Sequence, residues 1–129
     1  MSLQIVIEPP NGRQQRVALS GRVDTYTHLE LDQRLAPLLG NAGLDNLVLD
    51  LGGVDYISSA GVRSVFRARK ALSARGGKVL VLNPQPQVKK VFDIVKAVPL
   101  GDVFRSTVEL DAYLDKMQKK VLAGDDDDA

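Results

Sequence analysis

Two adjacent serines, Ser58 and Ser59, lie where an apolar stretch of the chain gives way to a helical pattern. The apolar run 47–51 predicts a strand, and the segment Asp55–Gly61 leads from it into a helix. The first turn of a helix carries backbone N–H groups without partners and the positive end of the helix dipole, so a negative charge is stabilised there. A phosphoserine carries about −1.5 to −2 charges. A serine at this helix start is therefore suited to act as a reversible charge switch.

The same serines have a simpler interpretation, because Ser is among the preferred N-cap residues of helices. An N-cap with a reciprocal partner would have Glu or Gln three residues later. Those positions hold Gly61 and Val62, and a cap needs only one serine. A structural cap and a modification site both stay open from the residues alone.

Groups for other kinds of chemistry are scarce. A serine hydrolase would need Ser59 as nucleophile and the one histidine, His28, as base. We interpret His28 as a partly exposed surface residue. The absence of cysteine excludes disulfides, thiolate zinc sites and cysteine nucleophiles, and neither the GxxxxGK[ST] nor the GxGxxG phosphate-binding pattern occurs. We expect a protein that works by binding, not an enzyme, and without a metal or other cofactor.

Length and composition point to one small globular domain. We predict a single domain over residues 1–122 and a disordered acidic tail over 123–129. The net charge of +1 includes the acidic run Asp125–Asp128, so the rest of the chain is mildly basic, but its bases are scattered and aromatic residues make up only 5%. This does not favour nucleic-acid binding. The start Met1–Glu8 lacks the features of a signal peptide, and no apolar run approaches the roughly 18 residues that span a bilayer. We expect a cytoplasmic protein without membrane insertion; its oligomeric state is not indicated.

We call the segment Asp55–Gly61 the serine junction. The residues before it predict two strands and a helix. Apolar residues alternate in 3–8, turn residues follow in 9–12, and 16–19 form a second apolar stretch, a pattern typical of a β-hairpin. Leucines at helical spacing then predict a helix over 31–39.

Two residues concern the ends of this helix. Thr27 and Glu30 have the spacing of a capping box, so Thr27 is the expected N-cap. Pro37 lacks a backbone donor and is expected to kink the helix or end it early.

The runs 47–51 and 79–82 predict two strands that are covered on both faces. Between them, apolar residues at helical spacing in 62–72 predict a helix that ends at Gly76-Gly77. A strand–helix–strand unit predicts parallel strands with a right-handed crossover. Functional residues of open α/β sheets lie at the carboxyl ends of such strands, which is where the serine junction falls.

The last third of the chain predicts two helices with a short strand between them. Pro86 fits the first turn of one helix, 103–104 predict an edge strand, and Ser106 with Glu109 forms a second capping box. The predicted fold is therefore of the α/β class, with a mixed sheet of four to five strands and helices packed on it, in the order β-β-α-β-α-β-α-β-α.

Three segments, in this order, resemble the motifs of STAS domains, and of bacterial anti-sigma factor antagonists in particular. They are 19–24, the strand and serine junction of 47–62, and the helical segment 85–92. The resemblance covers about residues 3–118 and implies the STAS fold.

The resemblance also implies a mechanism. Such proteins bind an anti-sigma factor, often a serine kinase of the GHKL type, and thereby free a sigma factor. The kinase phosphorylates a serine at the start of the second helix, which ends binding, and a PP2C-type phosphatase reverses this. In the family pattern Asp-Ser-Ser-Gly the acceptor follows the aspartate. Placed on this sequence, Ser58 stands at the aspartate position and Ser59 at the acceptor position, so Ser59 is the expected acceptor and Ser58 the fallback.

The resemblance further implies a partner-binding surface around the acceptor. Its expected residues end the second strand or begin the second helix: Asp24, Thr25, Ser58, Ser59, Ala60, Gly61, Val62 and Arg63. Asp24 has a second interpretation, as an acid held by local hydrogen bonds at a strand–helix turn. Arg63 is either a partner for a phosphate on Ser59 or an ordinary solvated helix residue.

Three positions depart from the family pattern. Ser58 replaces the aspartate, Arg22 stands where the family often has glutamate, and Arg63 where many members have glycine. The missing aspartate motivates an alternative hypothesis, in which the chain is a non-phosphorylated STAS interaction module of a transporter or a larger signalling complex.

Overall fold

The computed structural model describes residues 2–97 and 106–124. Within these ranges the chain forms four strands and four helices. They are β1 (Leu3–Ile7), β2 (Gln14–Val23), α1 (His28–Leu39), β3 (Asn46–Ile57), α2 (Ser59–Ser73), β4 (Lys78–Leu82), α3 (Pro86–Ala97) and α5 (Thr107–Leu122). The edge strand predicted at 103–104 lies outside the described residues.

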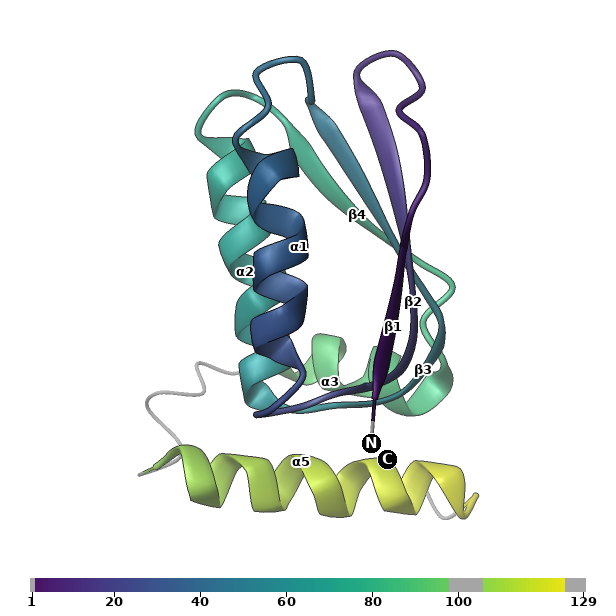
Figure 1. The fold of residues 1–129 in the computed structure, drawn as a ribbon. Coiled ribbons are helices and arrows are strands. Elements are labelled where there is room, and N and C mark those ends of the chain that lie inside the picture. Colours follow the sequence, from purple (N-terminus) through teal and green to yellow (C-terminus); the bar gives the residue numbers. More distant parts are fainter. Residues whose placement is uncertain (1, 98–105, 125–129) are drawn as a thin grey trace.

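The strands form one sheet in the order β1-β2-β3-β4. β1 pairs with β2 in antiparallel fashion, whereas β2 with β3 and β3 with β4 are parallel. The predicted hairpin, the mixed sheet and the α/β class are confirmed. Parallel neighbours require crossover connections, which α1 and α2 supply. The carboxyl ends of β2 and β3 therefore lie side by side, at the foot of the sheet in Figure 1.

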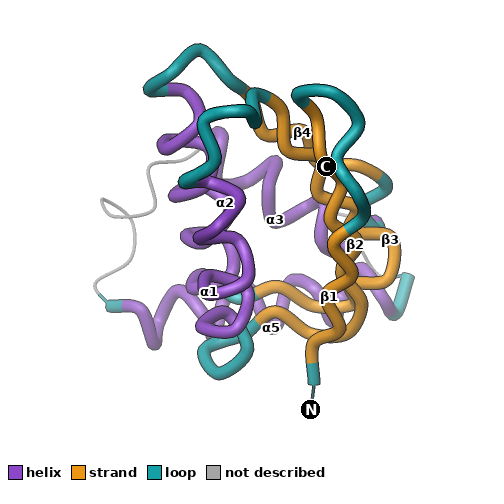
Figure 2. Tube along the Cα trace, turned by 45° about the horizontal axis from the view of Figure 1, so that its top comes forward, coloured by secondary structure: helices purple, strands orange, loops and turns teal. Residues whose placement is uncertain are grey.

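α1 and α2 lie next to each other on one face of the sheet (Figure 1), and the tilted view of Figure 2 shows the same pairing. Side chains from these two layers make up most of the core. Its largest fully buried apolar residues are Leu19, Leu31, Leu35, Leu44, Leu47, Leu49, Leu51, Ile57, Leu72 and Leu114. α5 stands apart from the helix pair and runs across the end of the sheet where β2 and β3 finish (Figure 1).

The two apolar strands differ in burial. Leu47 and Leu49 of the central strand β3 are fully buried, as predicted. β4 is the outer strand of the described sheet, and its Leu80 is 46% exposed. The prediction that this second strand is covered on both faces is therefore wrong for the described part of the chain, because an edge position leaves its side chains with fewer neighbours.

The start of α1 differs from the prediction. Thr27 is the N-cap by position, but its side chain makes no capping hydrogen bond, so the capping box with Glu30 is wrong; the acceptor that replaces it is described with the site. α1 ends at Leu39, two residues after Pro37. The proline thus lies in the last turn, where its missing N–H removes a single backbone hydrogen bond.

The ends of α5 are defined by local contacts. Ser106 Oγ accepts a hydrogen bond from Glu109 N at 3.1 Å, so the predicted N-cap of this helix is confirmed. Ala123 is the C-cap and Gly124 follows with a positive φ of 73°. The predicted tail 123–129 thus begins within the described end of α5, and 125–129 lie outside the described residues. None of the described helices combines the length and the apolar character needed to cross a bilayer.

Gly61 lets the first turn of α2 approach the sheet closely. A Cβ at this position would lie 2.7 Å from Val23 Cγ1 and 2.8 Å from Ile57 Cγ1, the last residues of β2 and β3. Even the smallest side chain would therefore push the helix start away from the strand ends.

Replacing Gly61 by alanine should lower the free energy of unfolding by about 1–3 kcal/mol, because overpacking forces side chains and backbone apart. Urea titration followed by circular dichroism measures the change. Gly40→Ala is the matched control, since a Cβ there would have Ala36 O at 3.5 Å as its nearest neighbour; it should stay within about 0.5 kcal/mol of the wild type. Equal stability of the two variants would contradict the close approach.

Candidate functional site

The serine junction is held at the edge of the sheet by backbone pairing. Val23 and Ile57 are register partners at the ends of β2 and β3. Ser58 N continues this pairing by donating a hydrogen bond to Val23 O at 2.8 Å. The turn that follows β2 and the turn that follows β3 therefore lie beside each other, which brings the neighbourhood of Asp24 to that of Ser58.

Ser58 is the N-cap of α2. Its backbone is extended, with φ −92° and ψ 174°, and its Oγ accepts a hydrogen bond from Gly61 N at 3.3 Å. The capping interpretation is confirmed for this serine, and it needs no glutamate three residues later.

Ser59 is the first residue of α2 and has no such role. Ser59 is 5% exposed to solvent, and its Oγ has no hydrogen-bond partner among the described residues. Its backbone N–H donates to Asp111 Oδ1 at 2.9 Å. A buried hydroxyl without a partner is unfavourable and uncommon in folded proteins. The hydroxyl of Ser59 is thus buried without a hydrogen bond from the described residues, as is that of Ser64 further along α2.

A second contact ties α5 to the end of β3. Gln118 Oε1 accepts a hydrogen bond from Ile57 N at 3.0 Å, and Gln118 Nε2 donates to Ile57 O at 2.9 Å. Gln118 is 1% exposed. Its amide pairs with the last residue of β3 as a neighbouring strand would. Two side chains of α5, those of Asp111 and Gln118, therefore form hydrogen bonds with the backbone of the serine junction.

The sequence did not predict Asp111 and Gln118 as part of this site. They lie 52 and 61 residues from their partners along the chain, and α5 was interpreted from its apolar face alone. One signal was present for Gln118. It follows Met117 on the face formed by Leu114 and Val121, and a polar residue on a buried helix face must find a hydrogen-bond partner.

Asp24 organises the turn after β2. Its Oδ1 accepts hydrogen bonds from Tyr26 N at 2.9 Å and Thr27 N at 3.0 Å, and its Oδ2 accepts from Arg22 Nε at 3.0 Å. Asp24 thus caps the turn that leads into α1, whereas Thr27 holds the N-cap position of the helix itself. Burial opposes ionisation of the carboxyl, but these donors outweigh it, so the pKa of Asp24 lies below its usual value. The local-hydrogen-bond interpretation describes this geometry; partner contact by Asp24 stays a prediction.

Arg22 is held between two neighbours. It pairs with Tyr56 across β2 and β3, its Cζ lies 3.7 Å from the centre of the Tyr56 ring, and its Nε bonds Asp24. Burial, with the carboxylates of Asp115 and Asp111, raises the pKa of the Tyr56 phenol despite the arginine. The two α5 carboxylates therefore act on the same edge of the sheet as the serines.

The eight residues predicted to bind a partner differ in exposure. Thr25 and Arg63 are exposed, whereas Asp24 and the run 58–62 are buried. His28 Nδ1 lies 3.3 Å from Asp32 Oδ2. His28 makes no hydrogen bond to the hydroxyl of Ser59. The structure thus gathers the predicted residues at one edge but covers most of them.

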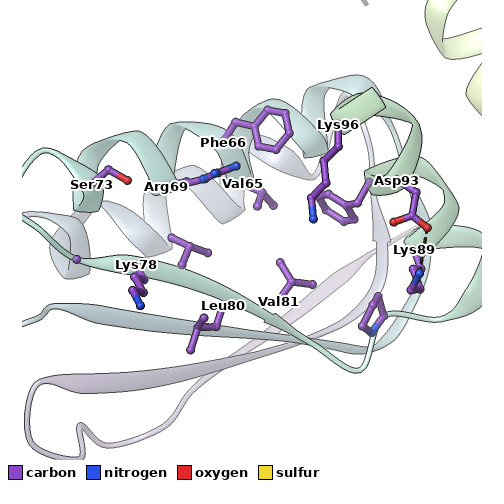
Figure 3. A pocket seen from close by; sticks show the side chains of 14 residues that line it. Val65, Phe66, Arg69, Ser73, Lys78, Leu80, Val81, Lys89, Asp93 and Lys96 are labelled. Atoms are coloured by element: carbon purple, nitrogen blue, oxygen red, sulfur yellow. Dashed lines mark hydrogen bonds and ion pairs between the residues drawn. The ribbon is translucent and has the colours of Figure 1, made fainter. Parts of the chain in front are cut away.

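A groove elsewhere on the domain contains none of these residues. It has a volume of about 550 Å³ and lies between α2, β4 and α3 (Figure 3). Apolar side chains such as Val65 and Phe92 line it, and Arg69, Lys78 and Lys96 stand around it. The serine junction is therefore a surface covered by a helix and not part of this groove.

Comparison with known proteins identifies the family. Residues 12–110 match the model of the STAS domain, which is more than half of the chain. This chain belongs to the STAS domain family. The resemblance found in the sequence is thus confirmed.

Individual relatives of this STAS domain are regulators of anti-sigma factors by name. A protein of Bordetella bronchiseptica, BtrV, itself named as a candidate anti-sigma factor antagonist, is 38% identical over 76 residues, which are 59% of this chain and 65% of that protein. The match thus spans slightly less than two thirds of BtrV.

Two solved structures share the fold. The Bacillus cell fate determinant SpoIIAA in its phosphorylated form gives a TM-score of 0.62 at 20% identity, covering 71% of this chain and 83% of that one. An anti-sigma factor antagonist from Mycobacterium paratuberculosis gives 0.64 at 19% identity, covering 80% and 83%. At these identities the likeness concerns the fold, and it confirms the predicted STAS-type architecture.

Asp24→Ala should lower the free energy of unfolding at pH 7 by about 0.5–2 kcal/mol, because two backbone N–H groups of the turn before α1 lose a charged acceptor. Because the folded pKa lies below the unfolded value of about 3.9, the carboxylate stabilises the fold above that pH and loses this effect as the pH falls through the folded pKa. The difference from wild type should therefore shrink on acidification.

Urea unfolding at pH 7 and in a series down to pH 3 measures this difference. Asp93→Ala is the control, because its exposed pair with Lys89 on α3 should contribute at most about 1 kcal/mol. Asp24→Ala as stable as wild type at pH 7 would contradict the capping role.

Proposed function

We propose that this STAS domain is a cytoplasmic anti-sigma factor antagonist that binds an anti-sigma factor until Ser59 is phosphorylated. The observation that carries the proposal is the division of roles between the two serines. Ser58 caps α2, which leaves the hydroxyl of Ser59 without a structural partner at the positive end of the same helix. A group that the fold does not use, in the place where a negative charge is most stabilised, favours a modification site.

The names of the relatives support the partner class. BtrV carries the name of an anti-sigma factor antagonist, and SpoIIAA has been solved in both unphosphorylated and phosphorylated forms. By analogy, the proposed partner is an anti-sigma factor of the GHKL serine kinase type, which would also be the kinase, and a PP2C-type phosphatase would remove the phosphate.

Binding without catalysis is the activity that the junction supports. A hydrolase would need a base in contact with the nucleophile, and the described residues offer the Ser59 hydroxyl no hydrogen-bond acceptor. Phosphate on Ser59 would change the charge of the surface and add desolvation cost and like-charge repulsion toward a partner. The phosphate thereby switches binding off.

Incubation of the purified protein with its GHKL-type kinase and ATP should add one phosphate, located on Ser59 by mass spectrometry. Ser59→Ala should take up none. Ser58→Ala is the matched control, because it removes the neighbouring hydroxyl and leaves the acceptor; it should still be phosphorylated although it loses a cap. Phosphate on Ser58, or on neither serine, would contradict the proposal.

The alternative, a non-phosphorylated interaction module, is favoured by Ser58 in place of the family aspartate. Partner capture separates the two. With the phospho-switch, Ser59→Asp should weaken capture of the anti-sigma factor by about tenfold or more, which corresponds to 1.4 kcal/mol. With the constitutive module, Ser59→Asp and wild type should capture the same partners equally.

A further inference from the structure

α5 contacts the serine junction through two polar side chains, in addition to the apolar residues that it contributes to the core. Asp111 binds the N–H of Ser59, and the amide of Gln118 binds both backbone groups of Ile57. The carboxylate of Asp111 thus already occupies the position at the start of α2 where the helix favours an anion. The helix that carries both residues lies across this end of the domain (Figure 1).

The contact leaves Ser59 closed to a kinase. A hydroxyl must reach the γ-phosphate of ATP in line with the leaving group, and Ser59 is 5% exposed with its Oγ buried. In this arrangement the acceptor cannot meet an active site on another protein. Asp24 and residues 58–62, which are most of the residues expected to bind the partner, are buried as well.

α5 is held to the domain by apolar as well as polar contacts, and it lies against α3 and α2. It adds no strand to the sheet, and its buried apolar residues are Leu110, Leu114 and Met117. Its other apolar side chains are largely open, with Val108 80% and Leu122 63% exposed. Moving α5 away from the serine junction therefore breaks two hydrogen-bonding side-chain contacts and part of this apolar packing, and it is a local opening that stops short of global unfolding.

The charges of α5 make its position sensitive to modification of Ser59. Asp111 bonds the N–H of Ser59, and Asp115, one turn further, acts on Tyr56 beside the junction. A phosphate on Ser59 would face these carboxylates at close range, where like charges repel strongly. It would also compete with Asp111 for the N–H groups at the start of α2.

This contact belongs to a part of the chain beyond the family match. The STAS model ends at residue 110, the fourth residue of α5, so Asp111 and Gln118 both follow it.

We propose that α5 is an intramolecular cover of the phosphoacceptor: Asp111 and Gln118 hold it over Ser59, kinase and partner reach the serine only when it moves away, and phosphate on Ser59 keeps it away. The inference rests on the proposed function of Ser59. It makes the closed, unmodified domain a resting form. The opened, unmodified domain binds the partner and is the substrate of the kinase, and phosphate on Ser59 then ends partner binding by its charge.

Amide hydrogen exchange of the full chain tests the cover without a kinase. Asp111→Ala should raise the exchange of Ser59 N–H by about tenfold or more, and Gln118→Ala that of Ile57 N–H, while Leu49 in β3 stays protected. Ser59→Asp should raise the exchange of the Ile57 N–H, because its negative charge repels Asp111 and moves α5. The Ile57 N–H is informative because its hydrogen bond is to Gln118 and not to residue 59. Two further variants serve as controls. Asp111→Asn keeps an oxygen acceptor and replaces Asp111→Ala if the alanine disturbs folding.

Glu109→Ala removes an exposed carboxylate from the same helix, so it should change the exchange of neither the Ser59 nor the Ile57 N–H.

Phosphorylation rates provide the second measurement. If the GHKL-type kinase modifies wild type at Ser59, it should modify Asp111→Ala several-fold faster and Glu109→Ala at the wild-type rate. Equal phosphorylation rates for wild type and Asp111→Ala would overturn the proposal that α5 covers Ser59. Unchanged exchange of the Ile57 and Ser59 N–H groups in Asp111→Ala, Gln118→Ala and Ser59→Asp would also overturn it. Faster exchange without phosphorylation of any variant would support the cover and refute the proposed function, so the two fail separately.

Discussion

The parallel pairing of β2 with β3 is the constraint on which the rest of this domain depends. It aligns Val23 with Ile57, and Ser58 N extends the pairing by one further hydrogen bond to Val23 O. Two strand–helix turns must therefore lie side by side at one edge. One carries Asp24 and starts α1, and the other carries the serines and starts α2. The absent side chain of Gly61 lets α2 begin directly against both strand ends.

The paired serines show how a small fold separates structure from function at neighbouring positions. Ser58 satisfies the helix end, so its hydroxyl is fixed by folding. Ser59 follows on the first turn with a hydroxyl that no described residue binds. Because Ser58 alone supplies the cap, a change of charge at Ser59 leaves the cap of α2 in place. A phosphate would still meet the helix dipole, but it would meet the acidic side of α5 as well.

α5 contributes chemistry that differs from the rest of the domain. The sheet, the α1–α2 pair and α5 share one apolar core, but α5 also reaches the junction through a carboxylate and an amide. Apolar packing is insensitive to a phosphate, but a carboxylate bound to the same helix end is displaced or repelled by one. The polar attachment thus makes the helix responsive in a way that a leucine contact would not.

Sequence alone determined the local pattern of this protein: the hairpin, the strand–helix–strand unit, the helix start at Ser58-Ser59 and the STAS family. Periodicity and caps act over a few residues, and the family motifs are contiguous. Thr27 holds the predicted N-cap position of α1, but the side chain that binds backbone N–H groups there is that of Asp24, in the preceding turn. The turn geometry alone decides which of these two side chains is the acceptor. The outer position of β4 among the described strands, the burial of Ser59 and its contact with Asp111 were decided by tertiary structure alone. Those features depend on packing between segments about fifty residues apart, and no spacing along the chain encodes which side chain will face the start of α2.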